Sequence, residues 1–275
     1  MSYRFPRSRF VISVLFSFLV LASSLSAQSL PQATQPDNSG AESQVTTPVE
    51  KPLETPALKK DAFFSKGFAR QLLSDQKTIW TSPASITASD AKWLVPLAAG
   101  TTVLLLEDTR ISHAFDGKTS IQNTSEKVSD AGALATWGVP GAFLALGKIK
   151  GNDRMVDTGE RGFQAAIYST IVMTGLKMAT NRTRPYQGGN GSFLNGGDSF
   201  PSGHSMEAWA LATVIAREYP DKPLVKWGMY SLATAVSLSR ITSQHHYASD
   251  VLVGSSIGYL IGRFVTRNAH PAAVQ

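Results

Sequence analysis

Two histidines, His245 and His246, stand side by side in the stretch SRITSQHHYASD (239–250). Adjacent side chains point in different directions on a regular backbone, so only one imidazole is expected to share a site with Asp250. If the chain from His246 is helical, Asp250 follows by four residues on the same face. Its carboxylate can then accept a hydrogen bond from one ring nitrogen and leave the other nitrogen free to react. Ser249 has the same spacing from His245 and is a poorer partner, so His246 is predicted to be the reactive histidine.

A second stretch, KMATNRTRP (177–185), supplies cations. Lys177 ends an apolar run that is expected to be helical, and Arg184 follows seven residues later, directly before Pro185. The proline disfavours helical backbone at Arg184 and predicts an extended conformation there. Positive side chains are also common at the end of a helix, where they suit the helix dipole. This stretch alone therefore does not indicate a site.

The third stretch, FPSGHS (200–205), is typical of the start of a helix. Ser202 would precede the helix, Gly203 would let the backbone approach a ligand closely, and His204 would lie in the first turn. Free N–H groups and the positive end of the helix dipole suit such a start to binding an anion. The five glycines of YQGGNGSFLNGGDS (186–199) predict a mobile loop over this site.

Together the three stretches contain permanent cations, neutral hydrogen-bond donors, two histidines and a carboxylate. Such a set suits a tetrahedral oxyanion that is held without a metal ion. Each stretch by itself has an ordinary alternative; Asp250, for example, would begin a helix at 251–265 with both histidines in solvent. The chain has no cysteine, which excludes disulfides, thiolate metal sites and a cysteine nucleophile.

The combination of K-x6-RP, PSGH and SR-x5-H-x3-D resembles the three-part signature of the type 2 phosphatidic acid phosphatase (PAP2) family. Its superfamily also includes bacterial acid phosphatases and vanadium haloperoxidases. The resemblance spans residues 177–250 and extends weakly over a helical region from about residue 90. It implies an all-α fold, a helical bundle of about six core helices, and a phosphatase that uses no cofactor.

The resemblance also implies roles for the residues. His246 would attack phosphorus and form a phosphohistidine, Asp250 would orient His246, and His204 would serve as acid and then base. The remaining signature residues would hold the phosphate oxygens: Lys177, Arg184, Ser202, Gly203 and Arg240.

The implied substrates are phosphate monoesters or pyrophosphates, either small phosphate esters or phosphorylated lipids such as phosphatidate, phosphatidylglycerol phosphate, undecaprenyl pyrophosphate or lipid A. The apolar helices favour a lipid. Two alternatives remain open at this point. The same cage of donors would hold vanadate in a haloperoxidase, and a non-catalytic envelope protein would bind a phospholipid without hydrolysing it.

Helices must position these residues, because no apolar segment shows the strict alternation of a half-buried strand. A four-residue spacing of Phe64, Phe68 and Leu72 predicts a first helix, which the sequence TSPAS ends. Glycines at 254, 258 and 262 predict close packing along one face of the last helix. We expect one all-α domain over 61–268, followed by a short tail, 269–275. The further apolar segments that predict its core helices are 93–106, 131–149, 163–179, 206–216, 227–241 and 251–265.

The N-terminal region reads as an export signal and a tether. Three arginines precede the apolar run FVISVLFSFLVLA (10–22), which predicts a cleaved signal peptide over 1–27, and 28–60 is rich in Pro, Gln, Ser and Thr. We therefore expect a periplasmic or membrane-associated protein of a bacterial envelope, with a membrane surface as a partner. Without residues 1–27 the chain has 23 basic and 20 acidic residues, and a net charge of +3 does not indicate nucleic-acid binding.

Overall fold

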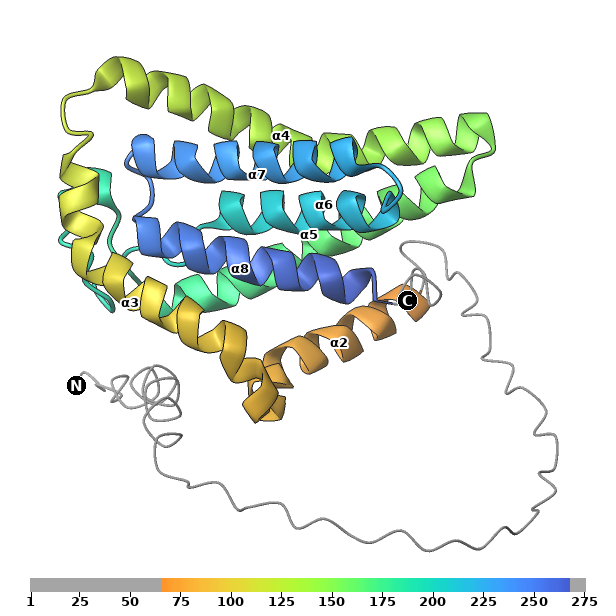
Figure 1. Cartoon of the computed structure of the whole chain (residues 1–275), viewed down its shortest axis with the longest axis horizontal. Helices are drawn as coiled ribbons and strands as arrows, with labels where there is room; N and C mark the ends of the chain where they lie inside the picture. The colour runs from red at the N-terminus through yellow and green to blue at the C-terminus, as the bar shows by residue number, and fades with distance from the viewer. Residues whose placement is uncertain (1–65, 268–275) are drawn as a thin grey trace, which may run out of the picture. The chain divides into compact units, whose positions relative to one another are not determined.

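A computed structural model of the chain describes residues 66–267. The predicted signal peptide (1–27), tether (28–60) and C-terminal tail (269–275) lie outside the described residues. Within them the chain forms seven α-helices and no β-strand, which confirms the predicted all-α class (Figure 1). The helices are α2 (Lys66–Thr81), α3 (Ala91–His113), α4 (Thr119–Lys150), α5 (Asp153–Thr180), α6 (Gly203–Glu218), α7 (Pro223–Thr242) and α8 (Ala248–Val265).

The described residues fall into two units that divide at Lys77 and Thr78, and the site lies entirely in the second unit. All six predicted core segments fall inside α3 to α8. Local signals explain some of the boundaries. Gly151 adopts a left-handed conformation with φ 61° and ends α4, and the Asn152 side chain then accepts a hydrogen bond of 3.0 Å from Met155 N to begin α5.

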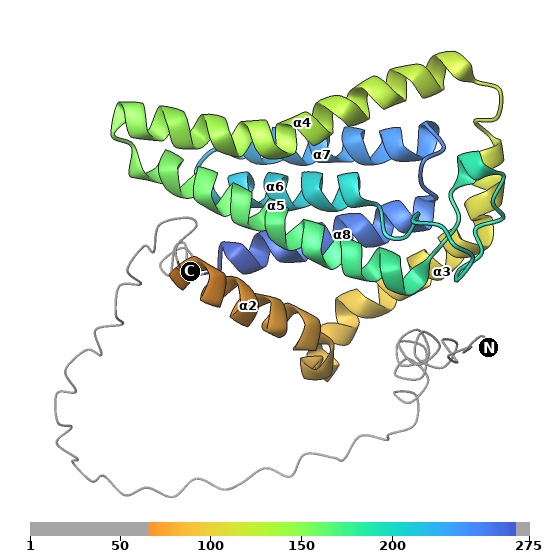
Figure 2. The ribbon, with the colours of Figure 1, turned by 180° about the vertical axis from the view of Figure 1, so that it is seen from behind.

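The most buried helix of the second unit is α6. It packs against α5, α7 and α8, and these neighbours lie beside it in both views (Figures 1 and 2). Ala210, Ala212 and Val214 are completely buried along it. Because α6 begins with the PSGH stretch, the best-packed part of the unit also holds one part of the signature.

The predicted glycine ridge packs against α6. A methyl group added at Gly254, Gly258 or Gly262 would lie 2.5, 2.0 and 2.6 Å from the backbone oxygens of Ser202, Met206 and Ala210, respectively. The backbones of α6 and α8 therefore come into contact at every fourth residue, which confirms the expected close packing. This contact holds the start of α6 against the start of α8, where His204 and Asp250 lie.

Large apolar side chains also lie on outer faces of the helices. Leu106, Leu134, Ile149, Leu224 and Trp227 are all more than half exposed. Between residues 66 and 267, no helix combines the length and the apolar content that crossing a membrane requires.

Candidate active site

The three stretches of the signature meet at one end of the second unit. The ends of α5 and α7 and the starts of α6 and α8 lie at that end, where one connection joins α5 to α6 and another joins α7 to α8 (Figures 1 and 2). Two helix N-termini therefore direct their positive dipole ends toward the same place. This arrangement suits a negatively charged ligand.

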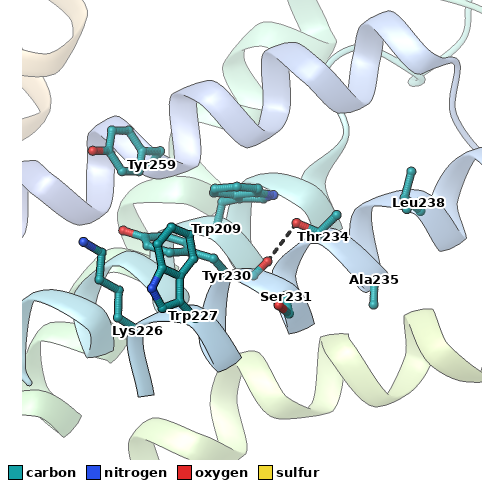
Figure 3. A pocket seen from close by; sticks show the side chains of 9 residues that line it. All are labelled: Trp209, Lys226, Trp227, Tyr230, Ser231, Thr234, Ala235, Leu238 and Tyr259. Atoms are coloured by element: carbon teal, nitrogen blue, oxygen red, sulfur yellow. Dashed lines mark hydrogen bonds between the residues drawn. The ribbon is translucent and has the colours of Figure 1, made fainter. Parts of the chain in front are cut away.

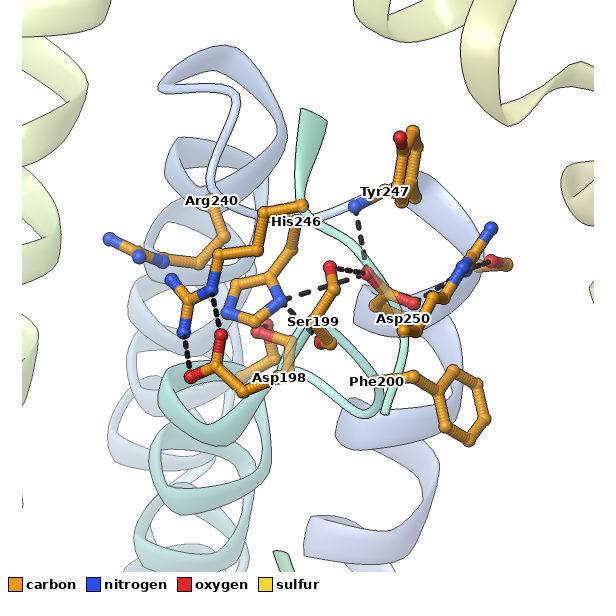
Figure 4. A network of polar contacts seen from close by, with 12 residues as sticks. Asp198, Ser199, Phe200, Arg240, His246, Tyr247 and Asp250 are labelled. Carbon is orange, nitrogen blue, oxygen red and sulfur yellow. Dashed lines mark hydrogen bonds and ion pairs between the residues drawn. The ribbon is translucent and has the colours of Figure 1, made fainter. Parts of the chain in front are cut away.

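His246 is almost completely buried in the turn between α7 and α8. Its Nδ1 donates a hydrogen bond of 2.6 Å to the backbone carbonyl of Ser199, while Oδ2 of Asp250 lies 3.7 Å from the same nitrogen (Figure 4). The expected helix from His246 is not present, since α8 begins at Ala248. Asp250 still reaches the ring, but the direct hydrogen bond that we expected from its carboxylate is made by a carbonyl group instead.

The carboxylate of Asp250 is completely buried and has several donors. Oδ2 accepts hydrogen bonds from the Ser199 hydroxyl at 2.6 Å and from Tyr247 N at 3.0 Å, and Oδ1 accepts one from Arg182 Nη1 at 2.6 Å. Burial alone would raise the pKa of Asp250, but the neighbouring His246 and the charge of Arg182 hold it below its ordinary value. Asp250 is therefore a carboxylate and not a carboxylic acid.

Arg184 and Lys177 share a carboxylate that the sequence did not single out. Arg184 has the extended backbone that Pro185 predicted, with φ −87° and ψ 153°. Its guanidinium holds both oxygens of Asp198, with Nε 2.6 Å from Oδ1 and Nη2 2.8 Å from Oδ2, and Lys177 Nζ lies 3.8 Å from Oδ2. Burial, followed by the charge of Arg184, lowers the pKa of Lys177. The carboxylate of Asp198 thus occupies the cations that are expected to bind a phosphate.

Arg240 is buried at the end of α7. One of its terminal nitrogens donates a short hydrogen bond to the Ser129 hydroxyl, but its Nε has no hydrogen-bond partner among residues 66–267. Burial, followed by the charge of Arg184, lowers the pKa of Arg240 to about 10. An arginine with an unused buried donor is one that still has capacity to bind an anion.

Both signature histidines are held in the neutral form. Burial lowers the pKa of His204 to about 3, and Arg240, His246, Lys177 and Arg184 add to the shift through their charges. Burial likewise lowers the pKa of His246 to about 4, although Asp250 opposes this. The cations that act on His204 are those of the other two stretches, so the structure brings all three stretches together electrostatically.

Ser202 and Gly203 lie at the start of α6, as predicted, but their local contacts differ from the expectation. The buried Ser202 hydroxyl makes a 2.9 Å hydrogen bond with that of Ser205 and does not cap the helix. A methyl group on Gly203 would lie 2.1 Å from the sulfur of Met173. A larger residue at 203 would therefore displace the flexible side chain of Met173 on α5.

His245 points elsewhere. It packs against the ring of Tyr186, with 5.2 Å between ring centroids, and its Nδ1 lies 3.1 Å from the carbonyl and the hydroxyl of Ser243. The two adjacent histidines thus occupy different surroundings, as the argument from backbone geometry predicted.

The glycine-rich loop before α6 is anchored to the end of α5. Leu194 N donates to Thr180 O at 2.8 Å, and both Asn195 N and Gly197 N donate to Asn181 O, at 2.9 and 3.1 Å. The glycines predicted a mobile loop over the site, whereas the structure shows the loop hydrogen-bonded to the end of α5. These hydrogen bonds position Asp198 and Ser199, which contact the signature residues.

Sequence reasoning missed several residues around the signature. Ser129, Arg182, Asp198 and Ser199 contact signature residues, and Asp108 contacts Arg182. Arg182 stands two positions before Arg184, so its presence in a basic stretch was a usable signal. Asp198 and Ser199 directly precede the FPSGHS stretch. Asp108 had only a weak signal, namely an acid at the end of an apolar run, and it lies 74 residues before Arg182.

Known proteins share this part of the chain. Residues 163–272 match the sequence profile of the PAP2 superfamily. Lipid A 1-phosphatase from Porphyromonas gingivalis is 32% identical over 158 residues, which are 57% of this chain. The chain spans about a third of the length of that relative, since the match covers 32% of it.

Two solved structures are also similar. Aquifex aeolicus LpxE has 22% sequence identity and a TM-score of 0.46, with 59% of this chain and 94% of that chain covered. The first transmembrane PAP2 type phosphatidylglycerolphosphate phosphatase from Bacillus subtilis has 22% identity and a TM-score of 0.34, with 64% and 98% covered. The segment 163–272 that matches the PAP2 superfamily profile contains all eight signature residues, so the part of the chain that is similar to known proteins is the part that carries the site.

Proposed function

We propose that this protein is a phosphatase that hydrolyses phosphate monoesters or pyrophosphates through a phosphohistidine on His246. The observation that carries the proposal is the convergence of Lys177, Arg184 and Arg240 beside two neutral histidines, with a buried donor of Arg240 unused. Permanent cations that face one point can hold the oxygens of a phosphoryl group and offset the charge that develops as it is transferred.

The nucleophile follows from the hydrogen bond of His246. Because its Nδ1 faces a carbonyl oxygen at 2.6 Å, that nitrogen carries the proton and Nε2 keeps a free lone pair. With a pKa of about 4, the ring is neutral at pH 7. Nε2 forms a bond to phosphorus while the bond from phosphorus to the ester oxygen breaks, and Asp250 stabilises the ring as it becomes positive.

His204 completes the two steps. It donates a proton to the leaving oxygen, and it then accepts a proton from the water that attacks the phosphohistidine, which releases inorganic phosphate and restores His246. A pKa of about 3 is too low for an acid in the free site. A bound phosphate dianion would offset the neighbouring cations and raise the pKa of His204, so we expect the substrate itself to promote the acid form.

A phosphorylated lipid is the substrate class that we propose. The similar protein from Porphyromonas gingivalis is named lipid A 1-phosphatase. A groove of about 680 Å³ is lined by residues of α6, α7 and α8 (Figure 3). Its lining includes Lys226 and the aromatic side chains Trp209, Trp227, Tyr230 and Tyr259. Tryptophan and tyrosine beside lysine are typical of protein surfaces at the membrane–water boundary. Together with the exposed apolar side chains, this supports a membrane surface in the bacterial envelope as the place of action.

Turnover of a panel of phosphate esters by the purified full chain, with a chelator present, tests the proposal. The panel should include p-nitrophenyl phosphate, phosphatidate, phosphatidylglycerol phosphate, undecaprenyl pyrophosphate and lipid A. We expect the release of inorganic phosphate from at least one lipid, and its loss in His246→Ala. No hydrolysis of any member, or hydrolysis that survives His246→Ala, would contradict it. Oxidation of bromide with vanadate and peroxide, without hydrolysis, would indicate a haloperoxidase.

A further inference from the structure

Arg182 is a buried cation that does not belong to the set proposed to hold phosphate. Its side chain is 2% exposed and lies against the faces of two rings, Tyr247 at 4.4 Å and Phe193 at 4.8 Å. Every nitrogen of its guanidinium has an acceptor among the described residues: Nε donates to Gly191 O at 2.9 Å, Nη1 to Asp250 Oδ1 and the Ser249 hydroxyl at 2.6 and 2.8 Å, and Nη2 to Asp108 Oδ2 at 2.8 Å. Four of the five N–H groups of Arg182 are thus bonded within the protein, and its side chain is buried away from solvent.

Asp108 brings a second carboxylate to the same guanidinium. It comes from α3, outside the segment that matches the PAP2 profile, and only 1% of it is exposed. Its Oδ1 accepts a hydrogen bond of 3.0 Å from Ser249 N, and its Oδ2 accepts a short one from the Ser249 hydroxyl. These bonds fix Asp108 to the first turn of α8, one residue before Asp250.

The charge balance of this cluster matters for His246. Asp250 and Arg182 alone would form a neutral pair, whose electric field at a neighbouring ring is weak. Asp108 takes up the other side of the guanidinium, so two carboxylates share one cation and the cluster keeps a net charge of −1. That charge lies in a buried environment, where it acts most strongly on the ring 3.7 Å from Asp250.

We propose that Asp108, acting through Arg182, is a positioning residue that fixes the orientation and preserves the negative charge of Asp250 for the reaction at His246. The inference rests on the proposed phosphatase function. It predicts that α3, which contributes no residue to the signature, sets the strength with which the positive ring of the phosphohistidine is stabilised. If Asp108 only held α3 against α8, removing its charge would not change the stabilisation of the positive His246 ring.

Asp108→Asn is the decisive variant, because it removes the charge and keeps the size and the acceptor for Ser249 N. We expect kcat to fall by about 10- to 100-fold with KM little changed, as for other partners that orient a reacting group. The same substitution in an Asp250→Asn background should have almost no further effect, because Asp108 acts through Asp250. An equal fall in both backgrounds would show a merely structural role and overturn the proposal.

A titration of the His246 ring by NMR gives a second readout that does not require activity. Asp108→Asn changes the charge of the cluster from −1 to 0, so the protonated ring loses stabilisation and its pKa should fall. An unchanged or raised pKa would overturn the proposal. The other charged or titratable groups that act on His246 stay in place in this variant: Lys177 of α5, His204 of α6, Arg240 of α7, and Arg184 and Asp198 of the loop.

Glu218→Gln is the matched control. Glu218 is a buried carboxylate that pairs with Arg161, at the opposite end of α6 from His204. Its loss should lower stability, as the loss of Asp108 will, but leave kcat and the His246 titration unchanged. If Asp108→Asn does not fold, Ser249→Ala tests the same link, because its hydroxyl bonds to both Asp108 and Arg182. It should lower kcat at constant KM, and an unchanged kcat would contradict the proposal. An inactive wild-type chain would instead refute the phosphatase function itself.

Discussion

The two ends of the helical unit treat their charged residues differently. At the end away from the signature, Arg161 pairs with Glu218, and Arg154 pairs with Asp221 at 2.6 Å. The buried carboxylate there, Glu218, has a cation of its own, and Asp221 lies near both Arg154 and Lys222, with 3.7 Å to Lys222 Nζ. At the signature end, Lys177, Arg182 and Arg184 share three carboxylates, two of which are committed to Arg182. Arg240 has no ion pair within 4 Å among residues 66–267.

This difference shows how a helical bundle can hold an anion site. At the far end the buried Glu218 is satisfied by Arg161, so this pair leaves no unmatched charge for a ligand. At the signature end Lys177 and Arg184 share Asp198, which is half-exposed on a loop. Asp130 and Glu126 act on Arg240 through their charges without an ion pair among the described residues. A phosphate that replaces this carboxylate would restore the balance, so the two ends should respond very differently to substitution.

The largest expected difference concerns the histidines. His204→Ala should lower the turnover of alkyl phosphates by about 10²- to 10⁴-fold, because these leaving groups need a proton. With p-nitrophenyl phosphate, whose leaving group needs little protonation, His204→Ala should still form the phosphohistidine and accumulate it. Rapid quenching with labelled substrate would detect an acid-labile, alkali-stable label on the protein.

His245→Ala is the control for that experiment, because the neighbouring ring lies against Tyr186 and outside the site. It should keep most of the turnover. Near-total loss in this variant, or a label that persists in His246→Ala, would reverse the assignment of the nucleophile.

A smaller effect is expected for the arginines. Arg184→Lys should lower kcat/KM by about 10- to 100-fold, because an ammonium cannot replace a guanidinium that holds two oxygens at once. Arg154→Lys makes the same exchange at the far end, where it should lower the melting temperature without a change in kcat/KM. Steady-state kinetics and thermal unfolding of both variants check this, and equal kinetic losses would refute a special role for the signature end.

Asp198→Asn should have a modest effect in the opposite direction. Because the carboxylate competes with phosphate for Arg184 and Lys177, its loss should strengthen inhibition by inorganic phosphate several-fold. Asp221→Asn, at a similarly exposed carboxylate that also lies 2.6 Å from an arginine, should leave this inhibition unchanged. Weaker inhibition in Asp198→Asn would show instead that Asp198 holds the cations in place.

The smallest effect is one of pH. His246 must be neutral to attack, so kcat/KM should fall as the pH drops through about 4, well below the ordinary histidine value of 6.5. The same shift affects stability. In the unfolded chain His204 and His246 bind a proton near their ordinary pKa of 6.5, whereas in the folded chain they do so only at a lower pH. The free energy of unfolding should therefore decrease as the pH falls from about 6.5 to 4. Chemical denaturation at several pH values measures this, and His204→Asn should weaken the dependence.

Much of the fold was predictable from local patterns. All six core segments, the start of α6 after Ser202 and the extended backbone at Arg184 follow from apolar periodicity and from the restrictions that proline imposes. The close contact of α6 and α8 follows from three glycines at four-residue spacing. The start of α8 was less predictable. Asp250 lies near the His246 ring whether the chain is helical from His246 or turns there first, so the expected contact did not show where the helix begins.

The partners of the signature residues were harder to predict. Arg182 and Arg184 are two residues apart with the same side chain, yet one is buried between two carboxylates and the other binds a half-exposed one. Pro185 distinguishes the backbone of Arg184, but the local sequence does not show which carboxylates each arginine binds. Which arginine is neutralised depends on Asp108, which approaches from a helix 74 residues earlier in the chain.

The amino-acid sequence by itself determined the kinds of chemical group available, their order and the helices that carry them, because residue type and periodicity act over a few neighbouring positions. Only the tertiary structure decided which charges cancel and which stay available to a substrate. The interaction of two charges depends on their distance and on their burial, and residues remote in the chain set both. The hydrogen bond from His246 to the Ser199 carbonyl and the ion pair of Arg182 with Asp108 are two contacts between residues that lie far apart in the chain.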